Sequence, residues 1–204
     1  MESNPEKHNR KSYRLKGYDY TLAGAYFITF CVKDRECVFG HVINGEMVLN
    51  ELGKIAEENM EKIPNHFSNV RMGEFRIMPN HVHCILELRE KGKGSARKDS
   101  GDLSNTTDSG TPHLATEPGR VKDGNSSGPK LNRFSQHIPG SVSVIIQQYK
   151  ASVTKWCKKN KHNGFQWQGR FHDHIIRNAA EYYFIANYII DNPAKWSKDK
   201  FYRK

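Results

Sequence analysis

Residues 78–88 read MPNHVHCILEL. After Pro79, the side chains along this run alternate between two chemically different sets, and this alternation decides the fold. Successive side chains of a β-strand point to opposite faces of the sheet. One face of this strand would carry His81, His83, Ile85 and Glu87. The other face is wholly apolar, with Val82, Cys84, Leu86 and Leu88. We expect the apolar face to pack on helices and the histidine face to lie on the open side of the sheet.

The segments around this strand predict a mixed order of strands and helices. Residues 25–32 (AYFITFCV) are typical of a strand, and Asn44-Gly45 between apolar runs predicts a hairpin over 38–49. Further elements are expected at 50–63 (helix), 70–77 (strand), 141–159 (helix), 165–177 (strand or extended) and 178–192 (helix). This order predicts an α+β fold in which helices pack on one face of a sheet.

The 204 residues fit one domain with additions at two places. Residues 1–20 form a basic, aromatic arm. Residues 21–204 are expected to form a single domain that is interrupted at about 90–140, where Gly, Ser, Asp, Asn and Lys dominate. Such a segment buries too little apolar surface to offset its ordering entropy, so we expect a flexible insertion there.

The charge of the chain favours a polyanionic partner. Its formal net charge is +10 and its pI is about 9.4, which suits nucleic acid or an anionic membrane surface. Aromatic residues among the basic ones favour nucleic acid. No run approaches the ~18 apolar residues of a membrane span, and residues 1–7 lack the apolar core of a secretory signal. None of the four cysteines forms a C-x-x-C pair, so we expect reduced thiols and a cytoplasmic protein.

The pair His81 and His83 is a candidate metal site. Side chains at i and i+2 of a strand lie side by side, close enough to share one ion. With ten histidines in the chain, an H-x-H pair can also arise by chance, and a second one occurs at His172 and His174. The second pair has an acidic centre, and its members could instead contact phosphates or support the first pair.

Tyr188 and Asn192 form the second candidate group. They are one helical turn apart and therefore share a side of the last predicted helix. Asn192 could direct its amide oxygen at a metal. A phenol has a reference pKa of about 10, so its attack on a phosphodiester needs the charge neutralisation that a divalent ion supplies. Tyr149 is the competing nucleophile, but it shares a helical stripe with apolar residues and is expected in the core.

Basic and aromatic residues at several places are candidate DNA contacts. The candidates are Arg10, Lys11, Arg14, Lys16, Lys150, Lys155, Arg170, Arg177 and Trp167. Trp167 could stack on an unpaired base or pack against the core, and the sequence leaves both open.

Four runs together resemble a known family. Residues 78–83 (MPNHVH) resemble the HUH signature of single-tyrosine transposases, in which U is apolar. Residues 14–20 (RLKGYDY), 167–177 (WQGRFHDHIIR) and 188–193 (YIIDNP) resemble the REP-associated tyrosine transposase branch. The likeness covers most of the chain outside 90–140. That insertion, and a tail that ends soon after Trp196, depart from the family pattern and leave target choice open.

The resemblance implies a ferredoxin-like fold with an antiparallel sheet. It implies that His81 and His83 bind Mg²⁺ or Mn²⁺, with Asn192 as a third ligand. Tyr188 would attack single-stranded DNA, leaving a 5′-phosphotyrosine link and a free 3′-hydroxyl, and resealing would complete DNA recombination. The substrate would be an imperfect palindrome folded as a hairpin. The protein is expected to act as a monomer or a homodimer, and the sequence does not decide between them.

Two other functions are compatible with the sequence. The same fold could bind single-stranded nucleic acid without cutting it. In that case the histidines and Tyr188 could be replaced without loss of binding. A related HUH enzyme that initiates plasmid replication or transfer is a weaker alternative, because such enzymes usually carry larger additional domains.

Overall fold

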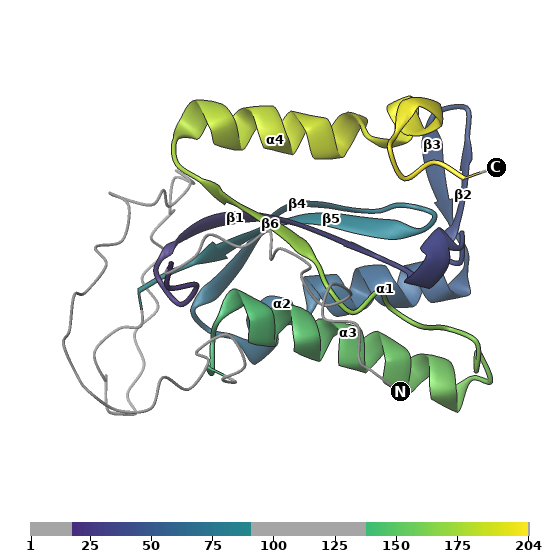
Figure 1. Cartoon of the computed structure of the whole chain (residues 1–204), viewed down its shortest axis with the longest axis horizontal. Coiled ribbons are helices and arrows are strands. Elements are labelled where there is room, and N and C mark those ends of the chain that lie inside the picture. The colour runs from purple at the N-terminus through teal and green to yellow at the C-terminus, as the bar shows by residue number, and fades with distance from the viewer. Residues whose placement is uncertain (1–17, 91–137, 204) are drawn as a thin grey trace, which may run out of the picture.

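A four-stranded antiparallel sheet forms the centre of the molecule (Figure 1). The computed structural model describes residues 18–90 and 138–203. The strands, in spatial order, are β4 (Val70–Ile77), β5 (His81–Leu88), β1 (Gly24–Cys31) and β6 (His172–Ile176). The sequence prediction of an α+β fold with an antiparallel sheet is confirmed.

Helices cover both faces of this sheet (Figure 1). On one side lie α1 (Glu51–Glu61), α2 (Ile63–His66) and α3 (Val142–Lys159). On the other side lies α4 (Ala179–Asp191). The smaller elements are η2 (Lys33–Arg35), the hairpin β2 (Gly40–Ile43) and β3 (Glu46–Leu49), and η4 (Pro193–Lys198).

Local sequence signals set the boundaries of these elements. Asn50, Ser141 and Asn178 cap α1, α3 and α4, and each side chain accepts a hydrogen bond from the backbone N–H three residues later. The hairpin turns at Asn44 and Gly45, whose φ angles are 52° and 81°. Positive φ at both turn residues matches the twist of the flanking strands, which is why Asn-Gly predicted this hairpin.

The main core lies between the sheet and the α1–α3 layer. Val82, Cys84, Leu86 and Leu88 of β5 are all buried there, as the alternation predicted. They pack with apolar side chains of α1 and α3, among them Leu52, Ala56, Met60, Ile145, Tyr149 and Val153. One face of β5 is therefore ordinary hydrophobic core.

The opposite face of the sheet is not open, which corrects the sequence expectation. Ile185, Ala186 and Ile189 of α4 pack on Ile85 of β5 and on Ala25. The cause is the apolar stripe of α4, which needs a partner, and the histidine face supplies one in its apolar members. The histidines consequently lie beneath α4 and its C-terminal continuation.

The segment predicted as strand or extended chain contains a shorter strand than its full length. We expected a strand or extended chain over 165–177, but pairing in the main sheet begins only at His172. Before that, Trp167 makes an isolated antiparallel bridge to Val32, and its ring packs on Phe30. This stretch closes the end of the core instead of extending the sheet.

Three further expectations concern the whole chain. Residues 1–17 and 91–137 lie outside the described residues, so the arm and the insertion stay predictions. All four cysteines are free thiols, as expected, with Cys31, Cys84 and Cys157 buried. Among the described residues, no helix combines the length and the hydropathy that a membrane crossing requires.

Candidate metal site with an adjacent tyrosine

The two histidines of β5 face each other beneath α4. Their Nε2 atoms are 3.0 Å apart, and both side chains are buried. The outer nitrogens are held by neighbouring side chains: His81 Nδ1 lies 2.9 Å from Asn80 Oδ1, and His83 Nδ1 lies 2.7 Å from Thr29 Oγ1. These contacts hold each ring at its Nδ1 atom, and the two Nε2 atoms are directed at one point.

The hydrogen bonds of Asn80 fix the proton position of His81. The Asn80 Nδ2 atom donates to the carbonyl oxygens of Arg35 and Phe201, which can only accept. The amide oxygen must therefore face His81 Nδ1, and that nitrogen must carry the hydrogen. A neutral His81 then presents a bare lone pair at Nε2, the form that binds a metal.

Both histidines are held neutral. Burial, together with the nearby cations Lys200 and Arg35, lowers the pKa of His81 to about 3. Burial and the neighbouring His81 ring also lower the pKa of His83 well below its ordinary value. Desolvation disfavours the charged imidazolium, so the lone pairs are available throughout the physiological pH range.

The C-terminal segment brings an amide and a carboxylate to this pair. Asn192 follows directly after α4 and is 2% exposed. Its Nδ2 donates to Asp199 Oδ2 over 3.1 Å, while its buried Oδ1 has no hydrogen-bond partner among the described residues. An unpaired buried amide oxygen is costly, and a cation would satisfy it.

Asp199 is a site residue that the sequence analysis missed. His81, His83 and Asp199 form a group that could hold a metal ion, since their candidate ligand atoms all lie within 4.8 Å of one another. Asp199 stands in the lysine-rich run KDK, and no spacing relates it to the histidines. Only the return of the chain after η4 places it there, and its Oδ1 is fixed by the Phe201 N–H at 2.6 Å.

The donor set fits a divalent ion. Two cis ligands of an octahedral ion at bond lengths of about 2.1 Å are about 3.0 Å apart. The Nε2–Nε2 distance of 3.0 Å agrees with this spacing. Imidazole nitrogens with an amide or carboxylate oxygen suit Mn²⁺ well and Mg²⁺ less well, because Mg²⁺ prefers oxygen ligands.

Tyr188 lies beside the histidines. Its hydroxyl oxygen is 3.4 Å from His83 Nε2, and its ring makes an edge contact with the ring of Phe27. Burial raises the pKa of the Tyr188 phenol, as does the Asp199 carboxylate, while the Asn192 amide lowers it. The half-buried phenol is therefore protonated near neutral pH and needs an electrostatic partner in order to attack.

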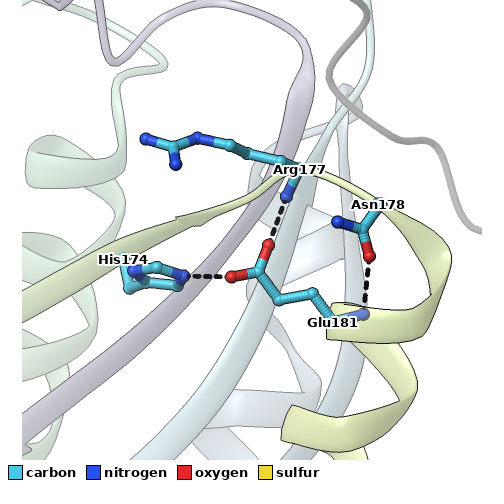
Figure 2. A network of polar contacts seen from close by, with 4 residues as sticks. All are labelled: His174, Arg177, Asn178 and Glu181. Atoms are coloured by element: carbon cyan, nitrogen blue, oxygen red, sulfur yellow. Dashed lines mark hydrogen bonds and ion pairs between the residues drawn. The ribbon is translucent and has the colours of Figure 1, made fainter.

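A polar network at the turn into α4 sets the start of the tyrosine helix (Figure 2). The Glu181 carboxylate lies 2.6 Å from His174 Nε2 and accepts from the Arg177 N–H over 2.8 Å. The Glu181 N–H in turn donates to Asn178 Oδ1. His174 of the second H-x-H pair is therefore part of this turn. Its partner Glu181 lies two helical turns before Tyr188.

A second contact anchors α4 to the sheet. The Tyr182 hydroxyl donates to Glu87 Oε1 over 2.7 Å, and Glu87 is 1% exposed. Glu87 is the last polar residue of the histidine face of β5. Both ends of that face therefore contact α4, His83 through Tyr188 and Glu87 through Tyr182. A side chain at Gly73 would collide with the Tyr182 hydroxyl, because a Cβ there would lie 2.5 Å from that oxygen.

The competing tyrosine lies in the core. Tyr149 is 3% exposed, and its hydroxyl donates to the Ala56 carbonyl over 3.0 Å. Burial raises its pKa well above the ordinary value. As expected from the apolar stripe, Tyr149 is a packing residue on the far side of the sheet from the histidines.

The predicted DNA contacts divide into three groups. Arg10, Lys11, Arg14 and Lys16 lie outside the described residues, while Lys155, Arg170 and Arg177 are exposed. Lys150 is half-buried and donates to the Gln168 carbonyl, and burial lowers its pKa to about 8. Trp167 is half-buried among core aromatics and donates to the Lys150 carbonyl. A DNA role for any of them stays a prediction.

One comparison with known proteins agrees with this fold. No family model matches the chain. The structure of a REP-associated tyrosine transposase bound to a REP hairpin aligns with a TM-score of 0.50 and 19% identity, over 91% of this chain and 73% of that one. A Deinococcus radiodurans structure aligns at a TM-score of 0.41 and 14% identity, over 87% of this chain and 97% of that one, which is too weak to support the fold assignment.

The chain therefore has the fold of a REP-associated tyrosine transposase and carries a histidine pair of the HUH type. It is also 37% identical to an uncharacterized protein of Haemophilus influenzae strain Rd, over 96% of this chain and 94% of that protein. The chain belongs to the family of that Haemophilus protein.

Proposed function

We propose that the protein is a metal-dependent, single-stranded DNA endonuclease and strand transferase of the tyrosine transposase type. The observation that carries this proposal is the placement of the Tyr188 hydroxyl 3.4 Å from His83 Nε2, at the edge of a neutral histidine pair. A protein that only binds nucleic acid has no need for two buried, neutral imidazoles beside a tyrosine.

His81 and His83 would hold the ion through Nε2, with Asp199 and the Asn192 amide oxygen as candidate third ligands. When bound, Mn²⁺ or Mg²⁺ would neutralise charge on the scissile phosphate and orient it. Tyr188 Oη would attack the phosphorus atom and lose its proton. The bond from phosphorus to the 3′ oxygen would break, and that oxygen would take up a proton. The products would be a 5′-phosphotyrosine and a free 3′-hydroxyl.

The substrate is proposed to be single-stranded DNA folded as a hairpin. Support comes from the REP hairpin bound by the structural neighbour, whose fold this chain shares. The net charge of +10 also suits a polyanionic partner.

The test is adduct formation on labelled hairpin oligonucleotides drawn from palindromes that flank the gene, with Mn²⁺ or Mg²⁺, read on a denaturing gel. Wild-type protein should form a covalent adduct that EDTA abolishes. Tyr188→Phe should form none. Tyr183→Phe is the matched control, because Tyr183 lies on the same helix but is 58% exposed and faces away from the site.

An adduct that survives in Tyr188→Phe and disappears in Tyr149→Phe would mean that the nucleophile was assigned wrongly. Tight binding of these hairpins with no adduct under either metal would favour the non-cleaving binding module.

A further inference from the structure

We propose that a basic groove beside the histidine pair binds the unpaired DNA strand next to the scissile phosphate. This inference rests on the proposed function and adds the path of the substrate. The groove has a volume of about 790 Å³ and lies along β1 toward β6, where Thr29, Phe171 and His172 line it. Thr29 also holds His83 Nδ1 at 2.7 Å, so the groove opens directly beside the metal site.

The charges of the groove are all of one sign. Arg35, Arg170 and Lys200 line it, and no carboxylate does. Arg170 is exposed and forms no ion pair with any residue that the structure describes. Such a channel attracts a phosphate backbone, and it leaves the cations available to a strand that enters it.

Phe201 fixes two of these cations close to the site. The guanidinium carbon of Arg35 lies 5.1 Å from the centre of the Phe201 ring, and Lys200 Nζ lies 4.8 Å from it. The same ring is 4.6 Å from the ring of His81. Arg35 is also tied down by its bond to the Lys200 carbonyl. Cation–π contacts of this kind hold the charges in place before the ligand arrives.

The lining points to a single strand. Phe171 is half-buried in the groove wall, whereas Phe201 lines the wall beside His81 but is itself buried. Nonspecific sites for single strands combine a basic groove with aromatic side chains on which unpaired bases stack. Bases inside a duplex offer no free faces, so we expect a clear preference for unpaired nucleotides.

The test measures binding in a Tyr188→Phe background, where no covalent step interferes. The probe is a fluorescent hairpin with an unpaired ten-nucleotide tail, titrated at several salt concentrations. The groove variant is the triple substitution Arg35→Gln, Arg170→Gln and Lys200→Gln. The matched control is Lys54→Gln, Lys158→Gln and Lys159→Gln, which removes three exposed cations from α1 and α3 on the other side of the sheet.

Each lost phosphate contact on a single strand lowers the slope of log K against log salt by about 0.7. The groove triple should therefore lower the slope by about 2 on the tailed hairpin and change little on a blunt hairpin. The control triple should leave both slopes near wild type. The groove assignment would be overturned if the two triple variants lowered the salt slope equally. It would also be overturned if the groove variant lowered the slope equally on the tailed and the blunt hairpin.

A second readout is independent of charge. A 4-thiothymidine placed in the tail next to the duplex junction should crosslink to the peptide that holds Phe171 or Phe201, and crosslinking only elsewhere would overturn the proposal. The groove proposal and the proposed enzymatic function can also be tested independently of each other. An adduct on Tyr188 with unchanged salt slopes would refute the groove alone, whereas the slope change with no adduct would refute the proposed enzyme alone.

Discussion

The two faces of β5 are equally buried but chemically opposite. All eight of its residues are buried, yet Val82, Cys84, Leu86 and Leu88 join the main core, while the other face carries two histidines and a glutamate. Burying apolar groups stabilises a fold, whereas burying polar groups costs free energy unless partners satisfy them. One face therefore carries stability, and the other bears a cost that the proposed metal site would explain.

The largest effect is expected from His83→Gln, which keeps approximate size but removes the Nε2 ligand. DNA cleavage should fall more than about 100-fold, since even groups that only support a ligand cost 10–100-fold. The unfolding midpoint should change little. The measurement pairs the adduct assay with a thermal melt, and His41→Gln on the exposed hairpin is the control. A folded His83→Gln variant that cleaves DNA as well as the wild-type protein would contradict the assignment of function to the histidine face.

Leu86→Ala probes the apolar face. Leu86 is fully buried, so the substitution should cost about 2–5 kcal/mol of unfolding free energy through lost burial and a cavity. Urea denaturation measures this loss. At a temperature where the variant is folded, cleavage should stay within a few-fold of wild type. A large loss of cleavage in the folded variant would show that the two faces are coupled.

The pH dependence of stability tests the burial of neutral histidine. The pKa of His81 is about 3 in the folded protein and about 6.5 when unfolded. Between these values the unfolded chain binds an extra proton, so stability should fall as pH falls, by up to about 1.4 kcal/mol per pH unit. The pKa of His83 is lowered as well, so His81→Gln should keep a slope in urea denaturation between pH 4 and 6, but a shallower one than the wild-type protein. Parallel profiles for the two proteins would contradict the assignment.

The smallest effect is expected from Asp199→Asn, which keeps an oxygen for the Asn192 amide but removes the negative charge. The Mn²⁺ concentration for half-maximal adduct formation should rise about tenfold if Asp199 is a ligand or orients one. Asp191→Asn is the control, because Asp191 is exposed and pairs with Lys195. An unchanged metal requirement would leave Asn192 as the third ligand.

The sequence predicted the parts of the molecule that depend on local patterns. The alternation of 81–88, the helices predicted from about 50 and 178, and the Asn44-Gly45 turn are all determined by patterns within a few residues. The proximity of Tyr188 to the histidine pair was expected only through the family resemblance.

The remaining features depend on contacts between distant segments. Asp199 reaches the site only because the chain turns back after η4, and its sequence neighbours give no sign of this. The cover of α4 over the histidine face was missed because that face reads as polar. Its apolar members, chiefly Ile85, pack against the helix, and Tyr182 of the helix pairs with Glu87.

The most direct test of the account is to locate the covalent bond. Wild-type protein would be incubated with the flanking hairpin DNA and Mn²⁺, digested with nuclease and protease, and analysed by mass spectrometry. The account predicts a nucleotide 5′-phosphate attached to Tyr188 and to no other tyrosine. A nucleotide on Tyr182, Tyr183 or Tyr149, or protein that stays unmodified under conditions where the DNA is cut, would contradict it.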